Sequence, residues 1–162
     1  MMRTALIVAT IVFAWLAPAR AEAIGCILLG CDCSVTASDI AFEPFSPLLA
    51  GPQTAIGEIE IVCTGLLSIG AGVTVEMLGG QWGVVSARKM RSGSGTLMAY
   101  NLYKTGAHNS VWGAGAQAMN VNGGLLVLGA WTARRDVFAR LDADPTLAPG
   151  DYTDTVVVRV IW

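Results

Sequence analysis

The sequence predicts an all-β protein folded as a β-sandwich, and three observations carry this prediction. Several stretches alternate apolar and polar residues with the period of two that is typical of a half-buried strand. Clusters of Gly, Pro, Ser and Asn separate these stretches and indicate turns at 44–47, 51–52, 79–80, 92–95, 122–124 and 149–150. Six to eight strands fit into the chain at this spacing, which is typical of two packed sheets.

Two of the expected strands, 57–63 and 72–78, alternate most clearly. Side chains on one face of a strand share the same parity, so one set is expected to enter the core. The core-facing residues are expected to be Ile59, Ile61, Cys63, Val73, Val75 and Met77. The solvent-facing residues are expected to be Glu58, Glu60, Thr74 and Glu76.

Three further strands are expected at 97–103, 124–131 and 153–162. The first contains two tyrosines, which favour strands. The second is a continuous apolar run, so we expect it to be buried on both faces. Residues 133–141 form a short segment with two arginines at its start, and we interpret them as a loop or a single turn.

Residues 1–21 are predicted to be an export signal that is removed after Ala21 or, alternatively, after Ala23. An apolar run over residues 5–17 follows an initial positive charge. This run is shorter than the ~20 residues that a membrane-spanning helix needs. We therefore expect an exported mature chain that begins near Glu22 and has no transmembrane segment.

Four cysteines follow the predicted signal, at Cys26, Cys31, Cys33 and Cys63. Disulfides are the default in an oxidising compartment, and four cysteines allow three pairings. Because Cys63 belongs to a regular strand pattern, it needs a partner from the N-terminal cluster. A bond from Cys33 to Cys63 would leave Cys26 and Cys31 to close a small local ring.

Charge and composition exclude several classes of function. The net charge of -2 gives no electrostatic basis for nucleic-acid binding. The single histidine, His108, has no nucleophile-elbow or carboxylate context, so we expect neither an enzyme nor a cofactor or metal site. The spacing of the late aspartates matches no known calcium loop, and Asp154 is expected to brace the turn before the last strand.

Some residues allow both a structural and a binding interpretation. Arg88, Lys89 and Arg91 form a basic cluster, which we interpret as a solvated hairpin flank and, alternatively, as an anionic-surface site for adhesion. The same interpretation applies to Arg134 and Arg135. The tryptophans allow either sugar stacking or packing, and packing in the core or a groove is expected for at least Trp112 and Trp162.

The last expected strand is strongly apolar and runs to Trp162. A strand of this kind must be covered on both edges, because an exposed apolar edge pairs with other chains and aggregates. One way to cover an edge is a strand supplied by another molecule.

Several short strings occur in a fixed order along the chain. They are Cys33–Ala37 (CSVTA), Ile59–Thr64 (IEIVCT), Arg88–Met90 (RKM), Leu97–Tyr103 (LMAYNLY), Val111–Gly113 (VWG) and Pro149–Val158 (PGDYTDTVVV). In this order the chain resembles the spore coat protein U domain family, which includes the subunits of archaic, Csu-type chaperone–usher pili. The resemblance covers residues 33–162, and its specificity lies in YNLY followed by WG and then GxYxDTV.

The resemblance implies an immunoglobulin-like β-sandwich that lacks its last strand. A periplasmic chaperone would supply that strand first, and the N-terminal extension of the next subunit would replace it in the fibre. The resemblance also implies a disulfide between Cys33 and Cys63. The acceptor groove is expected beside Val156, Val158, Val160 and Trp162. The donor segment is expected in the extension 22–32, with the apolar candidates Ile24, Ile27, Leu28 and Leu29.

By the same resemblance, the chain is expected to be an exported structural subunit that assembles by donor-strand complementation into adhesive surface fibres for attachment and biofilm formation. Its expected route leads through the periplasm to the cell surface. The expected partners are a periplasmic pilus chaperone, an outer-membrane usher and neighbouring pilin subunits. The alternative is a monomeric secreted or surface-bound binding or coat protein that does not polymerise.

The chain departs from the family pattern at three places. Glu43 follows Phe42, where the family usually has Gly. Ala130 and Trp131 follow Gly129, where the family usually has a polar or basic residue and Pro. The third departure is the extension 22–32, which is short and contains two cysteines. A bridge between these cysteines would curl the extension and spoil it as a donor strand.

Overall fold

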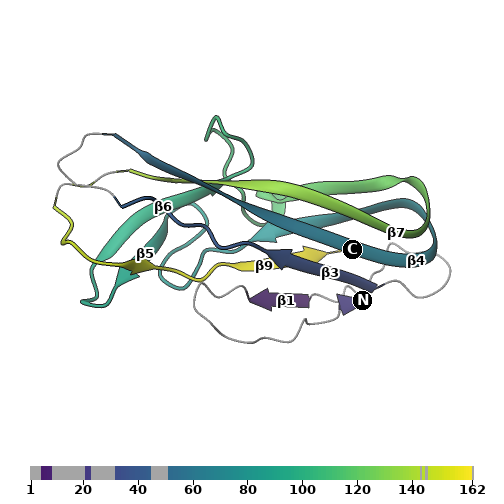
Figure 1. Cartoon of the computed structure of the whole chain (residues 1–162), viewed down its shortest axis with the longest axis horizontal. Helices are drawn as coiled ribbons and strands as arrows, with labels where there is room; N and C mark the ends of the chain where they lie inside the picture. The colour runs from purple at the N-terminus through teal and green to yellow at the C-terminus, as the bar shows by residue number, and fades with distance from the viewer. Residues whose placement is uncertain are drawn as a thin grey trace.

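The computed structural model describes residues 5–8, 21–22, 32–44, 51–142, 144 and 146–161. Nearly all regular structure in these residues is strand, with one short 3-10 turn, η1 (Gly115–Gln117) (Figure 1). The strands are β1 (Ala5–Val8), β2 (Ala21–Glu22), β3 (Asp32–Ala37), β4 (Gln53–Met77), β5 (Arg88–Ser92), β6 (Leu97–Tyr103), β7 (Met119–Leu141), β8 (Tyr152–Thr153) and β9 (Val157–Ile161). Within the described residues, no helix is long and apolar enough to cross a membrane.

One long antiparallel pair, β4 and β7, organises the fold. Its register runs from Gln53 opposite Leu141 to Val75 opposite Met119. The first half of β4 also pairs with β3, whereas its second half pairs with β9. On the other side, β7 pairs with β6, β6 with β5, and β5 with β8. The two halves of β4 therefore have different neighbours and belong to different layers.

Both long strands bend midway, and the bend turns one ladder into two layers. The register of β4 shifts between Gly65 and Ser68 and again between Ala71 and Gly72. Figure 1 shows both ribbons curling around at this end of the molecule. The halves before and after the bend pack against each other as the two sheets of a sandwich, which confirms the predicted architecture.

Glycine makes the bend of β7 possible. Gly123 and Trp131 belong to the same strand, yet a Cβ atom placed on Gly123 would lie 2.5 Å from the Trp131 ring. Gly129, between them, has φ +85°, a conformation that L side chains rarely adopt. The bend therefore depends on Gly123 because it has no side chain, and on Gly129 because glycine can adopt a positive φ.

The core lies between the two layers and consists of inward-facing residues of the long strands. All six residues predicted to face the core from β4 are at most 5% exposed: Ile59, Ile61, Cys63, Val73, Val75 and Met77. Trp112 is fully buried, as predicted, and its Nε1 donates a 3.0 Å hydrogen bond to the carbonyl oxygen of Val75. Burying each large apolar side chain contributes about 1.5–3 kcal/mol.

Residues 133–141 are strand, so the expectation of a loop or single turn there is wrong. Ala133, Val137, Ala139 and Leu141 are buried at alternate positions of β7. The alternation is hard to see in the sequence, because the charged Arg135 occupies one of the core-side positions. Arg135 is the register partner of the buried Ile59. These residues form a strand because they pair with the first half of β4, which is distant in sequence, and this pairing outweighs their local preference.

Two other expectations about the strands are also corrected. The expected strands 57–63 and 72–78 are parts of the single strand β4. The run 124–131 is not buried on both faces, because Gly129 and Ala130 are exposed. The bend places these two residues on the outside of the fold, which an apolar run in the sequence does not reveal.

Candidate functional site

An apolar groove lies between the segment after β3 and the start of β9. One wall is formed by residues 37–42 and the other by Val156 and Val158. The floor is made of core side chains from three strands, β4, β6 and β7: Ile59, Met77, Leu102, Val137 and Ala139. Residues 37–42 and β9 do not pair with each other, since β3 pairs with β2 and β4 while β9 pairs with β1 and β4. The groove is therefore a gap between two edges of the sandwich.

Of the four predicted groove residues, Val156 and Val158 line the groove, whereas Val160 is a core residue outside its lining. Val158 and Val160 face the core and are 5% and 0% exposed, and Val156 is half-buried at the groove. Trp162 lies outside the described residues. Sequence reasoning missed the opposite wall, although the apolar alternation of Ile40 and Phe42 was a readable signal for it.

The edge of β9 that faces away from β4 is paired with an antiparallel strand. Residues 5–8 form β1 and pair along this edge, from Ala5 opposite Val160 to Val8 opposite Val157. Of the two groove-lining residues on this side, Val158 lies opposite Ile7 within the pairing, and Val156 lies just beyond its end. β1 belongs to the segment predicted to be an export signal. A strand that pairs here as β1 does, if extended beyond its C-terminal end, would pass Val156 and enter the groove.

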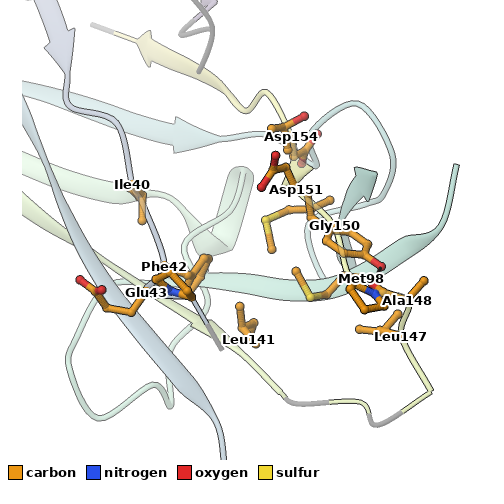
Figure 2. A pocket seen from close by; sticks show the side chains of 15 residues that line it. Ile40, Phe42, Glu43, Met98, Leu141, Leu147, Ala148, Gly150, Asp151 and Asp154 are labelled. Atoms are coloured by element: carbon orange, nitrogen blue, oxygen red, sulfur yellow. Dashed lines mark hydrogen bonds between the residues drawn. The ribbon is translucent and has the colours of Figure 1, made fainter. Parts of the chain in front are cut away.

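A larger cavity of about 350 Å³ continues the groove toward the 147–154 segment (Figure 2). The two spaces share Ile40, Phe42, Met90 and Asp154. The cavity has an apolar base formed by Met90, Met98 and Leu141, and its rim includes Glu43 and Asp151. The departure at Glu43 thus places a carboxylate at the mouth of this cavity.

Asp154 braces the turn before the last strand, as predicted. It is 5% exposed and accepts hydrogen bonds from the Gln81 backbone N–H at 2.8 Å and the Tyr100 hydroxyl at 2.7 Å. Burial and the hydrogen bond to Asp154 together raise the pKa of Tyr100, so this hydroxyl stays protonated. Gly80 has φ +82° and leaves room for the carboxylate of Asp154. The brace fixes the chain that leads into the groove wall.

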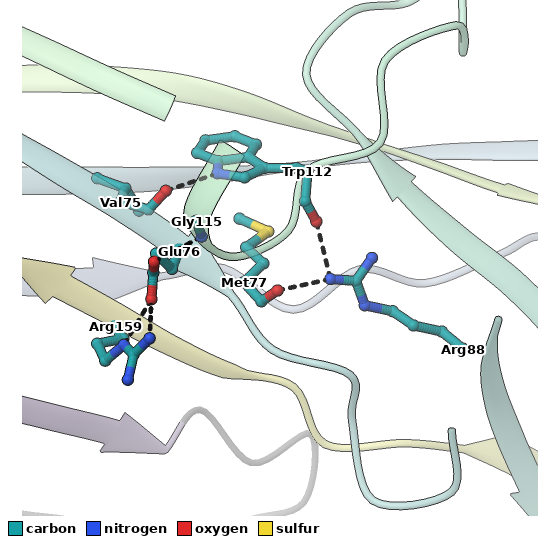
Figure 3. Close-up of polar contacts among 7 residues, drawn as sticks. All are labelled: Val75, Glu76, Met77, Arg88, Trp112, Gly115 and Arg159. Carbon is teal, nitrogen blue, oxygen red and sulfur yellow. Dashed lines mark hydrogen bonds and ion pairs between the residues drawn. The ribbon is translucent and has the colours of Figure 1, made fainter. Parts of the chain in front are cut away.

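Arg88 is fully buried, so the interpretation of it as part of a solvated flank is wrong. Its Nη2 donates to the carbonyl oxygens of Met77 and Trp112, both at 2.8 Å (Figure 3). Its Nε donates to the carbonyl of Leu78 and its Nη1 to Oδ1 of Asn101. Burial lowers the pKa of Arg88 to about 10. The guanidinium ties three segments of chain together at one end of the sandwich, including the end of β4 at the groove floor.

Glu76 is 4% exposed, which corrects the expectation that it faces solvent. It forms an ion pair with Arg159 of β9 and accepts a 2.8 Å hydrogen bond from the Gly115 N–H (Figure 3). Burial raises the pKa of Glu76, but the Gly115 bond and the Arg159 charge outweigh burial and lower it overall. The loop that carries η1 covers this outer face, and sequence alternation carries no signal of such a cover.

The disulfide joins Cys33 of β3 to Cys63 of β4, as the resemblance implied. It fixes the strand that leads into the groove wall at residues 37–42. The other predicted cysteines, Cys26 and Cys31, lie outside the described residues. So do the predicted donor residues Ile24, Ile27, Leu28 and Leu29.

The remaining candidates lie on the surface or in loops. Arg134 is exposed and pairs with Glu60 and Glu58, as a solvated flank would. His108 lies in a loop, with its ring edge-on to Tyr103. Among the described residues, no group of three or more His, Cys, Asp or Glu side chains is arranged to hold a metal ion.

Comparison with known proteins identifies one matching family model and similar solved structures. The model described as the Spore Coat Protein U domain matches residues 27–159. The crystal structure of the CsuC–CsuE chaperone–tip adhesion subunit pre-assembly complex, from archaic chaperone–usher Csu pili of Acinetobacter baumannii, contains a similar chain. The TM-score is 0.51 at 25% identity, and the match covers 82% of this chain and 40% of that chain. This likeness confirms the immunoglobulin-like form of the sandwich.

A second solved structure is the chaperone–tip adhesin complex of CFA/I fimbriae, with a TM-score of 0.47 and 13% identity. That match covers 78% of this chain and 41% of the other. The chain thus spans less than half the length of either solved chain. No curated protein sequence matches it.

Proposed function

This chain belongs to the Spore Coat Protein U domain family, and from this premise we propose that it is an exported pilin-like subunit completed by a strand from another molecule. The single observation that carries the proposal is the apolar groove between residues 37–42 and the start of β9. Its floor is made of buried core side chains, whereas its wall residues Ile40, Phe42 and Val156 are only half-buried. A strand laid in this groove would cover the half-buried wall residues and pair with the edge of β9.

The pairing of β1 with β9 supports the proposal. β1 is antiparallel to β9 and lies on the edge that leads into the groove. If residues 1–21 are removed on export, this edge loses its partner. An unpaired apolar edge strand is an aggregation hazard, so a replacement strand would be needed. Burying four or five apolar side chains of the replacement would contribute roughly 7–15 kcal/mol.

The proposed donor in a fibre is the extension 22–32 of the next subunit. Fully extended, these residues span roughly 36 Å, enough to run past β9 and along the groove. The family match begins at residue 27, inside this extension. A Cys26–Cys31 bridge would shorten the reach, so the proposed donor form is the one in which these two cysteines do not pair with each other.

The proposed partners follow from the same groove. A periplasmic chaperone would occupy it before assembly, an outer-membrane usher would catalyse the exchange, and neighbouring subunits would occupy it in the fibre. The solved relative above is a chaperone bound to a tip adhesion subunit. The proposed role is structural, in a surface fibre that serves attachment and biofilm formation, and it involves no enzymatic reaction.

One observation favours a second candidate function. Because β1 comes from the same chain, a chain that retained this segment would cover the β9 edge itself. Such a chain would be a monomeric secreted or surface-bound binding or coat protein. The two candidates differ in whether the segment that completes the sandwich belongs to the same molecule.

The deciding experiment compares residues 22–162 with residues 33–162, each expressed in the periplasm with and without the chaperone from the same gene cluster. Size exclusion should show that both forms need the chaperone, and that only the form with the extension yields oligomers when the chaperone is displaced. The variant Val156→Asp should lose recovery by the chaperone. Ile56→Asp is the matched control, because Ile56 is 63% exposed and lies outside the groove. A chain 1–162 that is a stable monomer without chaperone, and whose intact mass shows residues 1–21 still attached, would favour the second candidate.

A further inference from the structure

The outer face formed by β5, β6 and β8 carries a cluster of cationic and apolar side chains that the groove does not use. Arg91 lies with its guanidinium carbon 4.5 Å from the centroid of the Trp82 ring. Lys89 lies two residues away on the same strand, and Leu97 stands opposite Arg91 on β6. We call Trp82, Lys89, Arg91 and Leu97 the Trp82 patch.

The strand alternation turns both cations outward. Arg88, Met90 and Ser92 are buried, whereas Arg91 is exposed and Lys89 is half-buried between them. Side chains two residues apart on one face are separated by roughly 7 Å. Trp82 is 40% exposed and Leu97 is 42% exposed, so apolar surface borders the cations. The patch therefore presents two positive charges beside an aromatic ring and an aliphatic side chain.

Arg91 is held in place before any ligand arrives. Its guanidinium lies over the Trp82 ring on one side and near Gly95 on the other, where an added Cβ would be 3.4 Å from Nη2. A cation stacked on an indole ring loses less freedom on binding than a free arginine. Among the described residues neither Arg91 nor Lys89 forms an ion pair, whereas Arg134, Arg140 and Arg159 each do. The two charges of the patch are thus left to an external anion.

We propose that the Trp82 patch binds an anionic polysaccharide. Carboxylate or sulfate groups repeated along such a chain would accept hydrogen bonds from Arg91 and Lys89. The apolar faces of the sugar rings would pack on Leu97 and on the exposed part of Trp82. Two cations on a chain of net charge -2 are too few for nucleic-acid binding, which depends on many phosphate contacts. This surface function is separate from strand exchange and goes beyond it.

The test uses the exported chain in whichever form is recovered, alone or bound to its chaperone, so that it does not depend on strand exchange. Biolayer interferometry measures binding to immobilised alginate, dextran sulfate and neutral dextran. Wild type should bind one or both charged polymers, less tightly at high salt, and should not bind neutral dextran. Arg91→Gln should weaken binding by at least ~10-fold, because it removes both the positive charge and the charge-assisted hydrogen bonds of the guanidinium. Arg134→Gln, an exposed arginine outside the patch, is the matched control and should stay within ~2-fold.

Two further variants separate charge from stacking. Trp82→Ala should weaken binding several-fold with the charge kept, and Trp82→Phe, which keeps a ring, should recover part of the loss. Equal urea midpoints for Arg91→Gln and wild type would establish that folding is unchanged. The proposal is overturned if neither charged polymer binds, if neutral dextran binds equally well, or if Arg134→Gln loses as much as Arg91→Gln. Tighter binding to duplex DNA or to anionic vesicles would also overturn it.

Discussion

Glu76 of β4 and Arg159 of β9 are register partners, and their side chains form an ion pair on the outer face of the sheet. The Gly115 N–H holds the carboxylate from the other side. The last strand is thereby fastened to the sheet through a charged contact as well as through its backbone ladder. Because the start of β9 forms one wall of the groove, this contact helps to position that wall.

Replacing Glu76 with Gln should destabilise the fold by about 1–3 kcal/mol, because Arg159 loses its charged partner while it is still partly shielded from water. Urea unfolding followed by tryptophan fluorescence measures this change. Glu60→Gln is the control, since Glu60 pairs with the exposed Arg134, and it should change stability by less than ~1 kcal/mol. Equal effects of the two variants would contradict the role given to Glu76.

The ion pair also predicts a pH dependence. Since the folded-state pKa of Glu76 lies below its ordinary value of 4.5, its contribution is fully present above that value and is lost as pH falls through the folded pKa. The urea midpoints of wild type and Glu76→Gln should therefore differ at pH 7 and converge on acidification below about pH 4.5. A difference that stays constant down to pH 3 would show that Glu76 titrates normally.

Replacing Arg88 with Met should cost at least about 3 kcal/mol. Met fills much of the volume but leaves the carbonyls of Met77, Leu78 and Trp112 and the Asn101 side chain without their donor. The neighbouring Lys89→Met, on the outward side of the same strand, should stay within ~0.5 kcal/mol. Chemical denaturation of the two variants side by side measures their free energies of unfolding. An Arg88→Met variant as stable as wild type would refute the anchoring role.

Gly123→Val should destabilise the bend of β7, because its side chain would enter the space of the Trp131 ring. The expected loss is roughly 1–3 kcal/mol. If the contact is the cause, the double variant Gly123→Val with Trp131→Ala should be less destabilised than the sum of the two single variants. A double-mutant cycle of unfolding free energies tests this, and strict additivity would exclude the contact.

Much of the groove could be predicted from the sequence. The alternation that predicts Ile59 and Met77 to face the core identifies part of its floor, and the apolar run around Val158 identifies one wall. The bend could not be predicted, because it depends on which strands pair over long distances. The roles of Arg88 and Glu76 were also hidden, since a charged residue in a strand pattern normally faces water. Glu76 is buried because the loop with Gly115 covers it. Arg88 is buried because backbone carbonyls from distant segments, such as that of Trp112, accept its hydrogen bonds.

The continuity of β4 and β7 through the bend has a consequence for how the domain comes apart. Each sheet contains part of the same two strands, so neither sheet can melt while the other stays intact. Unfolding should therefore be all-or-none despite the gap along one side. The ladder that links Gln53 to Leu141 joins residues distant in sequence, so folding is expected to be slow and to leave apolar segments exposed until late.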